Sequence, residues 1–271
     1  VHDMTFLRLS TTNRLSRALA RFQFEAGLNR AERAITVSKF TERDLIDMFP
    51  EAAGKTIVLY SDMGEDWYRL LRDRSPTESE LFPDASRLGS FFLYVGNFKP
   101  HKNVDMLVKA YSRARRAGHL GEHKLVLVGG DEANMSRVRH LIRSLEEEDH
   151  VLIFRDIDDR SLSRLYQAAV WFITASAYEG FGYPCVESMV AGCPVICHQG
   201  TSLIEVVGSA ALPIPSLSVD HVADTMRRAV EVHWDERQQF IEAGLRQARL
   251  FAPGETAEAF AGVCRNLCRT T

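Results

Sequence analysis

Six short apolar runs, separated by segments with helical periodicity, constrain the fold of residues 90–232 more than any other feature of the chain. Runs without polar alternation are typical of strands buried on both faces of a parallel sheet. Repeated alternation of strand and helix predicts an α/β fold, a doubly wound sheet with helices on both faces. We place strands at 91–95, 125–128, 151–154, 170–173, 194–197 and 210–213, and helices near 103–117, 134–148, 159–168, 184–191 and 218–232.

The N-terminal residues 1–67 are less regular. They hold a basic helical stretch over 14–33, two short apolar runs at 34–37 and 56–60, and a helix between the runs that Ser38 or Thr41 opens. The polar composition of 68–89 predicts a linker. Two further helices are expected near 234–249 and 255–269.

The composition argues against several classes of function. A net charge of −3 gives no electrostatic reason to expect nucleic acid as a partner. The five cysteines are odd in number and form no C-x-x-C pair, which argues against a disulfide framework or a zinc site and suits a reducing compartment. No stretch approaches the roughly 18 uninterrupted apolar residues of a membrane span. We expect a cytoplasmic location, with the inner face of the membrane as the alternative.

The loop after the strand at 170–173 carries the most chemistry. Glycines flank Phe181, so the backbone can approach a ligand closely and adopt positive φ. Pro184 is placed to open a helix whose free N–H groups and positive dipole end favour anionic oxygens. Two carboxylates, Glu179 and Glu187, converge on this glycine loop and helix start, which suits binding of sugar and ribose hydroxyls. The spacing alone is common by chance and also fits solvated surface acids.

This loop and several other segments together resemble one family. Tyr178 to Pro184 with Glu187 resembles the E-x7-E signature of the GT-B glycosyltransferases of family GT4, glycosyl transferases group 1. Residues 95–103, Val-Gly-Asn-Phe-Lys-Pro-His-Lys-Asn, look like the family's G-x-x-x-P-R-K-N loop. The resemblance covers roughly 34–270 and also includes segments in family order at 128–130, 162–169, 191–196, 202–208 and 251–257.

The resemblance implies a GT-B-type fold with a Rossmann-like C-terminal domain and an incomplete N-terminal domain. Residues 1–67 would be the C-terminal part of the acceptor-side domain, 68–89 a linker, 90–250 the nucleotide-sugar-binding domain and 251–271 a closing C-terminal helix. Such an N-terminal domain takes about 150 residues. A chain that starts at Val1 is therefore expected to be a fragment, or to be completed by a partner chain.

The resemblance also assigns roles to single residues. Lys102 would contact the donor's diphosphate, for which a lysine is a mobile point charge. The family usually has arginine before this lysine, whereas this chain has His101, which removes a fixed positive charge. Glu179 would lie beside the transferred sugar and Glu187 would bind the ribose. The other donor-binding candidates are Gly96 at the phosphates, the backbone of Phe181, Gly182 and Tyr183 at the sugar, Thr201 and Ser202 as weaker candidates at the diphosphate, and Arg155 at the base or in solvent.

Two N-terminal features are more ambiguous. His2 and Asp3 resemble the family's H-D pair, whose histidine faces the donor sugar, and the segment at 34–41 resembles its V-S-x-x-T strand end. An incidental histidine is the alternative. The basic stretch fits a solvated helix face, which we favour, or peripheral contact with an anionic membrane or lipid-linked acceptor. Its arginines are Arg8, Arg14, Arg17, Arg21, Arg30 and Arg33.

By this resemblance the chain is expected to act in retaining transfer of a hexose from a nucleoside diphosphate sugar to an acceptor hydroxyl, in glycan or polysaccharide synthesis. GDP-mannose is the favoured donor and UDP-glucose the next. The resemblance implies no cofactor and no obligatory metal, and the acidic residues at 156, 158 and 159 fit a helix cap. The alternative is a nucleotide-sugar-binding module that is inactive by itself. An epimerase of the same fold is a weaker third option.

Overall fold

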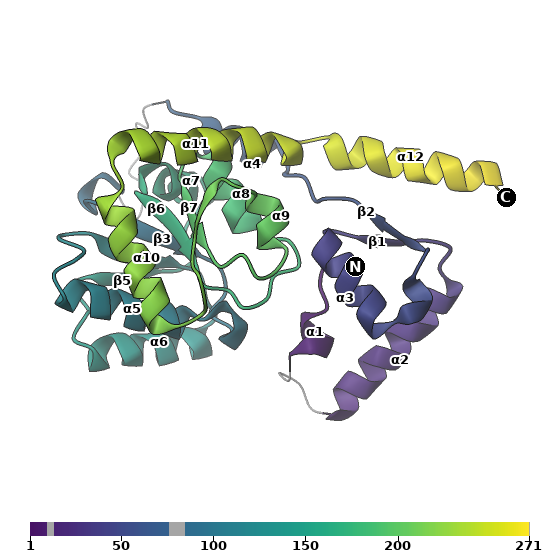
Figure 1. Ribbon diagram of the computed structural model, residues 1–271, viewed down its shortest axis with the longest axis horizontal. Helices are drawn as coiled ribbons and strands as arrows, with labels where there is room; N and C mark the ends of the chain where they lie inside the picture. Colours follow the sequence, from purple (N-terminus) through teal and green to yellow (C-terminus); the bar gives the residue numbers. More distant parts are fainter. Residues whose placement is uncertain (10–13, 76–84, 271) are drawn as a thin grey trace.

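A six-stranded, all-parallel sheet forms the middle layer of the larger body of the computed structural model, which describes residues 1–9, 14–75 and 85–270 (Figure 1). Each expected strand is present, with bounds within one residue of those expected. The strands are β3 (Phe91–Val95), β4 (Lys124–Val128), β5 (Val151–Phe154), β6 (Trp171–Thr174), β7 (Val195–Cys197) and β8 (Ala211–Pro213).

The strand order in this sheet is β5-β4-β3-β6-β7-β8. Within this sheet, the first strand in chain order, β3, therefore pairs with the fourth, β6, through the partners Phe92 with Trp171 and Leu93 with Phe172. The order reverses between these two strands, and ligands of open α/β sheets bind in the crevice outside the carboxyl ends of the strands at such a switch point. The loops after β3 and β6 are therefore the place where a site is expected.

Helices cover both faces of the sheet, as expected for a doubly wound fold. Successive side chains of β3 point to opposite faces, so that Phe91 and Leu93 enter one apolar core and Phe92 and Tyr94 enter the other. In Figure 1, α7 and α8 lie on one side of the strands and α5 and α6 on the other. The helices are α4 (Glu65–Arg72), α5 (Val104–Arg116), α6 (Glu132–Ser144), α7 (Asp159–Ala168), α8 (Tyr183–Val190), α9 (Leu203–Val207), α10 (Val219–Glu231) and α11 (Trp234–Ala248).

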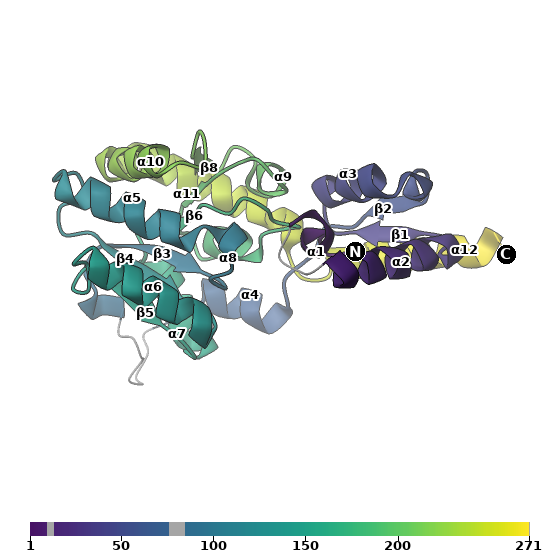
Figure 2. The same cartoon turned by 90° about the horizontal axis from the view of Figure 1, so that it is seen from below.

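The N-terminal region, which we define as the described residues up to 63, forms a smaller body beside the large sheet (Figures 1 and 2). Its two strands pair in parallel. Ser38 caps α3 by accepting a hydrogen bond from the Thr41 amide, which confirms the expected helix start. The elements are α1 (Thr5–Arg8), α2 (Arg14–Arg30), β1 (Ala34–Thr36), α3 (Lys39–Met48) and β2 (Thr56–Val58). The short 3-10 helices among the described residues are η1 (Pro50–Ala52), η2 (Ala85–Arg87), η3 (Pro100–Lys102) and η4 (Arg249–Phe251).

Two segments connect these bodies. The expected linker over 68–89 begins inside α4, which buries Leu71 completely. Residues 76–84 of that linker lie outside the described residues. The last helix, α12 (Glu255–Thr270), leaves the large sheet and runs past the N-terminal region, as both views show. The Thr256 hydroxyl there donates to the carbonyl oxygen of Tyr60, which ties the start of α12 to the N-terminal region.

No helix within the described ranges 1–9, 14–75 and 85–270 is long and apolar enough to cross a membrane.

Candidate functional site

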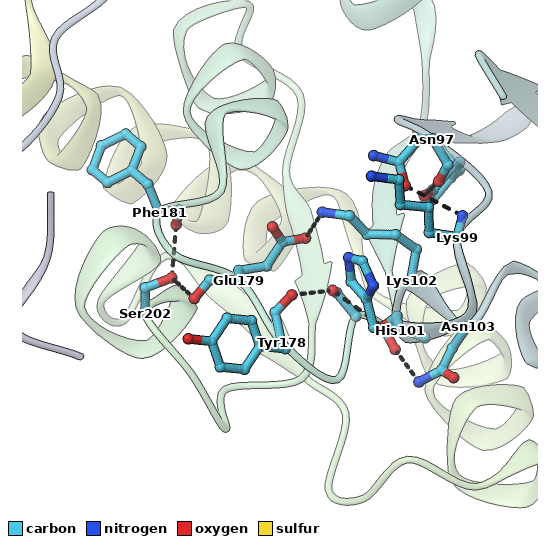
Figure 3. A network of polar contacts seen from close by, with 12 residues as sticks. Asn97, Lys99, His101, Lys102, Asn103, Tyr178, Glu179, Phe181 and Ser202 are labelled. Atoms are coloured by element: carbon cyan, nitrogen blue, oxygen red, sulfur yellow. Dashed lines mark hydrogen bonds and ion pairs between the residues drawn. The ribbon is translucent and has the colours of Figure 1, made fainter. Parts of the chain in front are cut away.

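An ion pair between Lys102 and Glu179 lies at the switch point of the sheet. Lys102 ends η3, which follows β3, and Glu179 is in the loop after β6. The lysine Nζ is 2.6 Å from Oε1 of the glutamate, and the two side chains are only 17% and 15% exposed (Figure 3). The sequence named both residues as candidates, and the fold brings them together because parallel neighbouring strands end at the same edge.

Hydrogen bonds between the two loops hold this ion pair in place. The residue after Lys102, Asn103, has a left-handed backbone (φ 55) and donates from its side chain to the carbonyl oxygen of Ala175 at 2.9 Å. The Ala177 amide donates to the carbonyl oxygen of His101 at 2.8 Å. Asn103 was not named as a site residue, although asparagine's tolerance of left-handed backbone is a usable signal.

A cavity of about 650 Å³ opens at the ion pair. Its wall combines the N-terminal region with the loops after β3 and β6. His2 is not among the lining residues, but its carbonyl oxygen lies against Gly180, and its neighbour Asp3 lines the cavity. The lining residues are Asp3, Thr5, Phe6, Asn97, Lys99, Pro100, His101, Lys102, Tyr178, Glu179 and Gly180.

His101 contributes an imidazole beside the ion pair. Its Nδ1 is buried and has no hydrogen-bond partner within the described part of the protein. Burial, reinforced by the positive charge of Lys102, lowers the pKa of His101 below its usual 6.5. The imidazole is therefore neutral near pH 7 and can gain a proton when negative charge arrives in the cavity.

The glycine loop, residues 179–182, depends on two glycines. A Cβ on Gly180 would lie 2.0 Å from the carbonyl oxygen of His2, so only glycine permits this close approach of the N-terminal backbone. Gly182 has φ 106 and caps α8, which begins at Tyr183, one residue earlier than expected. Between them the Phe181 side chain is buried against Phe251, with ring centroids 5.3 Å apart. Only the backbone of Phe181 is thus available to a ligand.

Glu187 occupies a different environment from Glu179. Its two carboxylate oxygens accept hydrogen bonds from Nε1 of Trp67 at 3.1 Å and from the Tyr166 hydroxyl at 2.6 Å. Burial raises the pKa of Glu187 above 4.5, and burial together with Glu187 raises the pKa of Tyr166 so that its hydroxyl remains a donor. Neither partner was named as a site residue from the sequence, because both lie on helices far away along the chain.

The remaining candidates divide into buried and exposed residues. The Thr201 hydroxyl is buried without a hydrogen-bond partner in the described ranges, and such a group is stabilised by a polar ligand. The amide of Gly96 donates to the Val128 carbonyl oxygen at 3.0 Å and is thus used by the sheet. Tyr183 is exposed, and its hydroxyl reaches the carbonyl oxygen of Asp62 at 3.4 Å.

Arg155 lies on the surface after β5, the edge strand. Its guanidinium pairs with Glu132 at 3.0 Å and with Asp156 at 3.1 Å. It makes no hydrogen bond or ion pair to Lys102, Glu179 or Glu187 in the described structure. The nearby Asp158 caps α7 by accepting from the Ser161 amide, which confirms the expected capping role for this member of the acidic cluster. Within the residues that the structure describes, no group of three or more His, Cys, Asp and Glu residues could hold a metal ion.

A six-stranded parallel sheet of this order, with a basic and an acidic side chain meeting at its switch point, is typical of the doubly wound α/β class, whose ligands bind at that edge of the sheet. The chain belongs to the family described as glycosyl transferases group 1, whose sequence profile matches residues 86–247. The matched segment contains η3, the glycine loop and both carboxylates.

Relatives of known function support this family. O-antigen chain mannosyltransferase B of Escherichia coli is 30% identical over 228 residues, which cover 83% of this chain and 58% of the relative. D-inositol 3-phosphate glycosyltransferase of Kineococcus radiotolerans is 26% identical over 254 residues, which cover 87% of this chain and 57% of the relative. The chain therefore spans little more than half the length of these two relatives.

Solved structures with the same fold are glycosyltransferases of the GT-B type. Sucrose-phosphate synthase of Thermosynechococcus elongatus matches with a TM-score of 0.80 at 22% identity, covering 100% of this chain and 67% of the other. HepE of Anabaena matches with a TM-score of 0.79 at 16% identity, covering 98% and 70%. These matches confirm the α/β, GT-B-type fold class that the sequence predicts.

Proposed function

We propose that this chain is the donor-binding part of a retaining hexosyltransferase that moves mannose from GDP-mannose to an acceptor hydroxyl. The observation that carries the proposal is the ion pair of Lys102 with Glu179 in the cavity at the switch point of the sheet. A lone surface lysine would not be held 17% exposed beside a carboxylate. Family membership adds the reaction class.

In this proposal, Lys102 and Glu179 separate when the donor binds. The bond from the anomeric carbon to the diphosphate breaks, and the diphosphate leaves with the additional negative charge, which Lys102 stabilises. The acceptor oxygen forms the new bond to the same carbon, on the same face, and its hydroxyl proton passes to the departing diphosphate oxygen. Glu179 positions the sugar and stabilises the positive charge that develops on its ring. The family's metal-free transfer is part of this proposal.

The rest of the donor would extend along the same edge of the sheet. Glu187 offers carboxylate oxygens to the ribose hydroxyls, and the unpartnered Thr201 hydroxyl would donate to the diphosphate. Arg155 would have to leave Glu132 and Asp156 to reach the base, so we assign it a solvent-facing role and no part in binding. His2 stays a proposed sugar-facing residue, since its backbone abuts Gly180.

The choice of sugar rests on relatives. O-antigen chain mannosyltransferase B and the relative of Salmonella typhimurium, RfbU, are both named mannosyltransferases. HepE has been solved in complex with UDP-glucose, which makes UDP-glucose the second candidate. The acceptor would be a glycan or a lipid-linked glycan.

A thermal-shift comparison tests the donor. GDP-mannose at about 100 times its Kd stabilises the folded protein by about 2.7 kcal/mol, which raises Tm by roughly 5–10 °C in a chain of this size. UDP-glucose and ADP-glucose should give smaller shifts. Lys102→Ala should reduce the shift to about half or less, whereas the exposed α5 variant Lys109→Ala should keep it in full. An equal shift in both variants, or none in the wild type, would refute the proposal.

Transfer itself needs a separate measurement. Donor hydrolysis or transfer to a mannose oligosaccharide by this chain would support the enzyme, with an α-anomer product from an α-donor as the sign of retention. Donor binding without either reaction would support the alternative of a binding module that depends on a partner chain.

We also propose peripheral contact of α2 with an anionic membrane. Leu15, Leu19 and Phe22 are exposed at i, i+4 and i+7, so they share one helix face next to the exposed Arg14. Sedimentation with vesicles containing phosphatidylglycerol should pull down the wild type, and Leu19→Glu with Phe22→Glu should prevent it. Equal sedimentation of both proteins would refute the contact.

A further inference from the structure

Buried hydroxyl groups hold three successive carbonyl oxygens of the glycine loop. Ser202 Oγ lies 2.9 Å from the Glu179 oxygen and 3.0 Å from the Phe181 oxygen and shares its proton between them (Figure 3). The Gly180 oxygen accepts from Ser38 Oγ at 2.7 Å and, through Thr41 Oγ1, at 3.0 Å. We call Ser38, Thr41 and Ser202 the hydroxyl clamp. All three side chains are fully buried.

The clamp has two sources that are far apart in the sequence. Ser202 precedes α9, in the body that contains the six-stranded sheet, whereas Ser38 and Thr41 belong to the N-terminal region. The docking of that region is reinforced by Glu205 of α9. Its carboxylate accepts the Lys39 and Phe40 amides at 3.0 and 2.8 Å, and the Tyr60 hydroxyl at 2.8 Å.

The loop amides contrast with the loop carbonyls. Among the described residues, the N–H groups of Gly180, Phe181 and Gly182 donate to no protein acceptor. Gly180 itself lines the cavity beside Glu179. Fixing the carbonyl oxygens fixes the peptide planes, and hence the direction of these amides, because each peptide unit is planar. Donors fixed before a ligand arrives need no reorganisation when it binds.

We propose that Ser38 and Thr41 are positioning residues for the donor sugar: by holding the Gly180 carbonyl oxygen, they orient the Phe181 amide of the same peptide unit toward the sugar hydroxyls, so that docking of the N-terminal region completes the sugar half of the site. This inference rests on the proposed function. The inference predicts that loss of the clamp weakens binding of the sugar but not of the diphosphate, because Lys102 would hold the diphosphate whether or not the clamp is intact.

Calorimetry with GDP and GDP-mannose tests this separation. In Ser38→Ala with Thr41→Val, the Kd for GDP should stay within about twofold of wild type. The Kd for GDP-mannose should rise about tenfold, the loss expected when roughly 1.4 kcal/mol of sugar contacts disappears. The ratio of the two Kd values is a readout that general destabilisation would not change. If the double variant does not fold, Thr41→Val alone serves, with a smaller expected rise in the ratio.

Two kinds of control sharpen the result. Ser163→Ala and Thr225→Val remove equally buried hydroxyls that donate to helical carbonyl oxygens elsewhere, and should leave the ratio unchanged. Thr41→Ser keeps a hydroxyl and should restore the wild-type ratio. A ratio unchanged in the double variant, with or without a lower Tm, overturns the positioning role alone. A wild type that binds neither nucleotide overturns the proposed function, and the inference with it.

Discussion

Glu179 and Glu187 are eight residues apart on one loop and helix, yet the protein surrounds them differently. Glu179 faces a cation, with Lys102 2.6 Å away, at the edge of an open cavity. Within the described residues, the donors to Glu187 are the neutral side chains of Trp67 and Tyr166, and burial raises the pKa of Glu187. Glu179 is thus paired with a cation, whereas Glu187 accepts hydrogen bonds in a buried environment. Two carboxylates in one motif can therefore serve different halves of a ligand.

Removing the cation beside Glu179 should have the largest effect. Lys102→Ala leaves that carboxylate unpaired and facing an incoming diphosphate, and hydrogen bonds to charged groups contribute about 1.5–3 kcal/mol. We expect the Kd for GDP, measured by calorimetry, to rise about 10- to 100-fold. Lys102→Ala with Glu179→Ala removes the repulsion and should recover part of the loss. A Kd within twofold of wild type in the single variant would contradict this account.

The second largest effect should come from removing the carboxylate of Glu187, and it should appear as a loss of stability. Glu187→Ala leaves the Trp67 and Tyr166 donors without their partner, and an unsatisfied buried donor costs about 1–3 kcal/mol. We expect the free energy of unfolding to fall by about 2 kcal/mol and Tm to fall by roughly 4–8 °C. The exposed Glu148→Ala should change Tm very little. Equal Tm values for the two variants would show that Glu187 has no structural role.

The pH dependence of stability tests the same contrast more finely. Because the folded-state pKa of Glu187 is raised above 4.5, the folded protein holds a proton there that the unfolded chain has already lost. This contribution to stability is present at low pH and is lost as pH rises through the window above 4.5. The stability of the wild type relative to Glu187→Gln should therefore decline from pH 4 to pH 7 in urea unfolding. Parallel curves would contradict the raised pKa.

The smallest effect should be the pH dependence of donor affinity caused by His101, which lines the same cavity as Glu179. The imidazole lies near the charges of Lys99, Lys102, Glu179 and Asp3, and its pKa is lowered. A bound diphosphate favours the protonated form, so donor affinity should rise as pH falls toward the lowered pKa of the imidazole in the free protein.

We expect the Kd for GDP-mannose to fall about threefold between pH 7.5 and 5.5, a change of less than 1 kcal/mol. This donor is suitable because its diphosphate diester keeps its charge over that range. His101→Gln should remove the trend. A trend that persists in His101→Gln would assign the proton to another group.

The sequence predicted the strands and helix caps correctly, because these features depend on residues that are neighbours in the chain. Apolar runs without polar alternation marked all six strands of the large sheet, and Ser38 and Asp158 were recognisable as helix caps. The helix α4 was missed because polar residues dominate 68–89. The spacing of Trp67 and Leu71 at i and i+4, with Leu71 fully buried, was the signal that could have revealed it.

The sequence by itself determined the class of fold, the family and the two carboxylates with their lysine, because periodicity and motif spacing are written along the chain. Only the tertiary structure decided the strand order, the Trp67 and Tyr166 partners of Glu187, and the clamp on Gly180. Those contacts join residues separated by between 21 and 142 positions. A hydroxyl or an indole on a helix carries no local mark of the carbonyl or carboxylate it will meet, so the packing of the whole chain has to supply it.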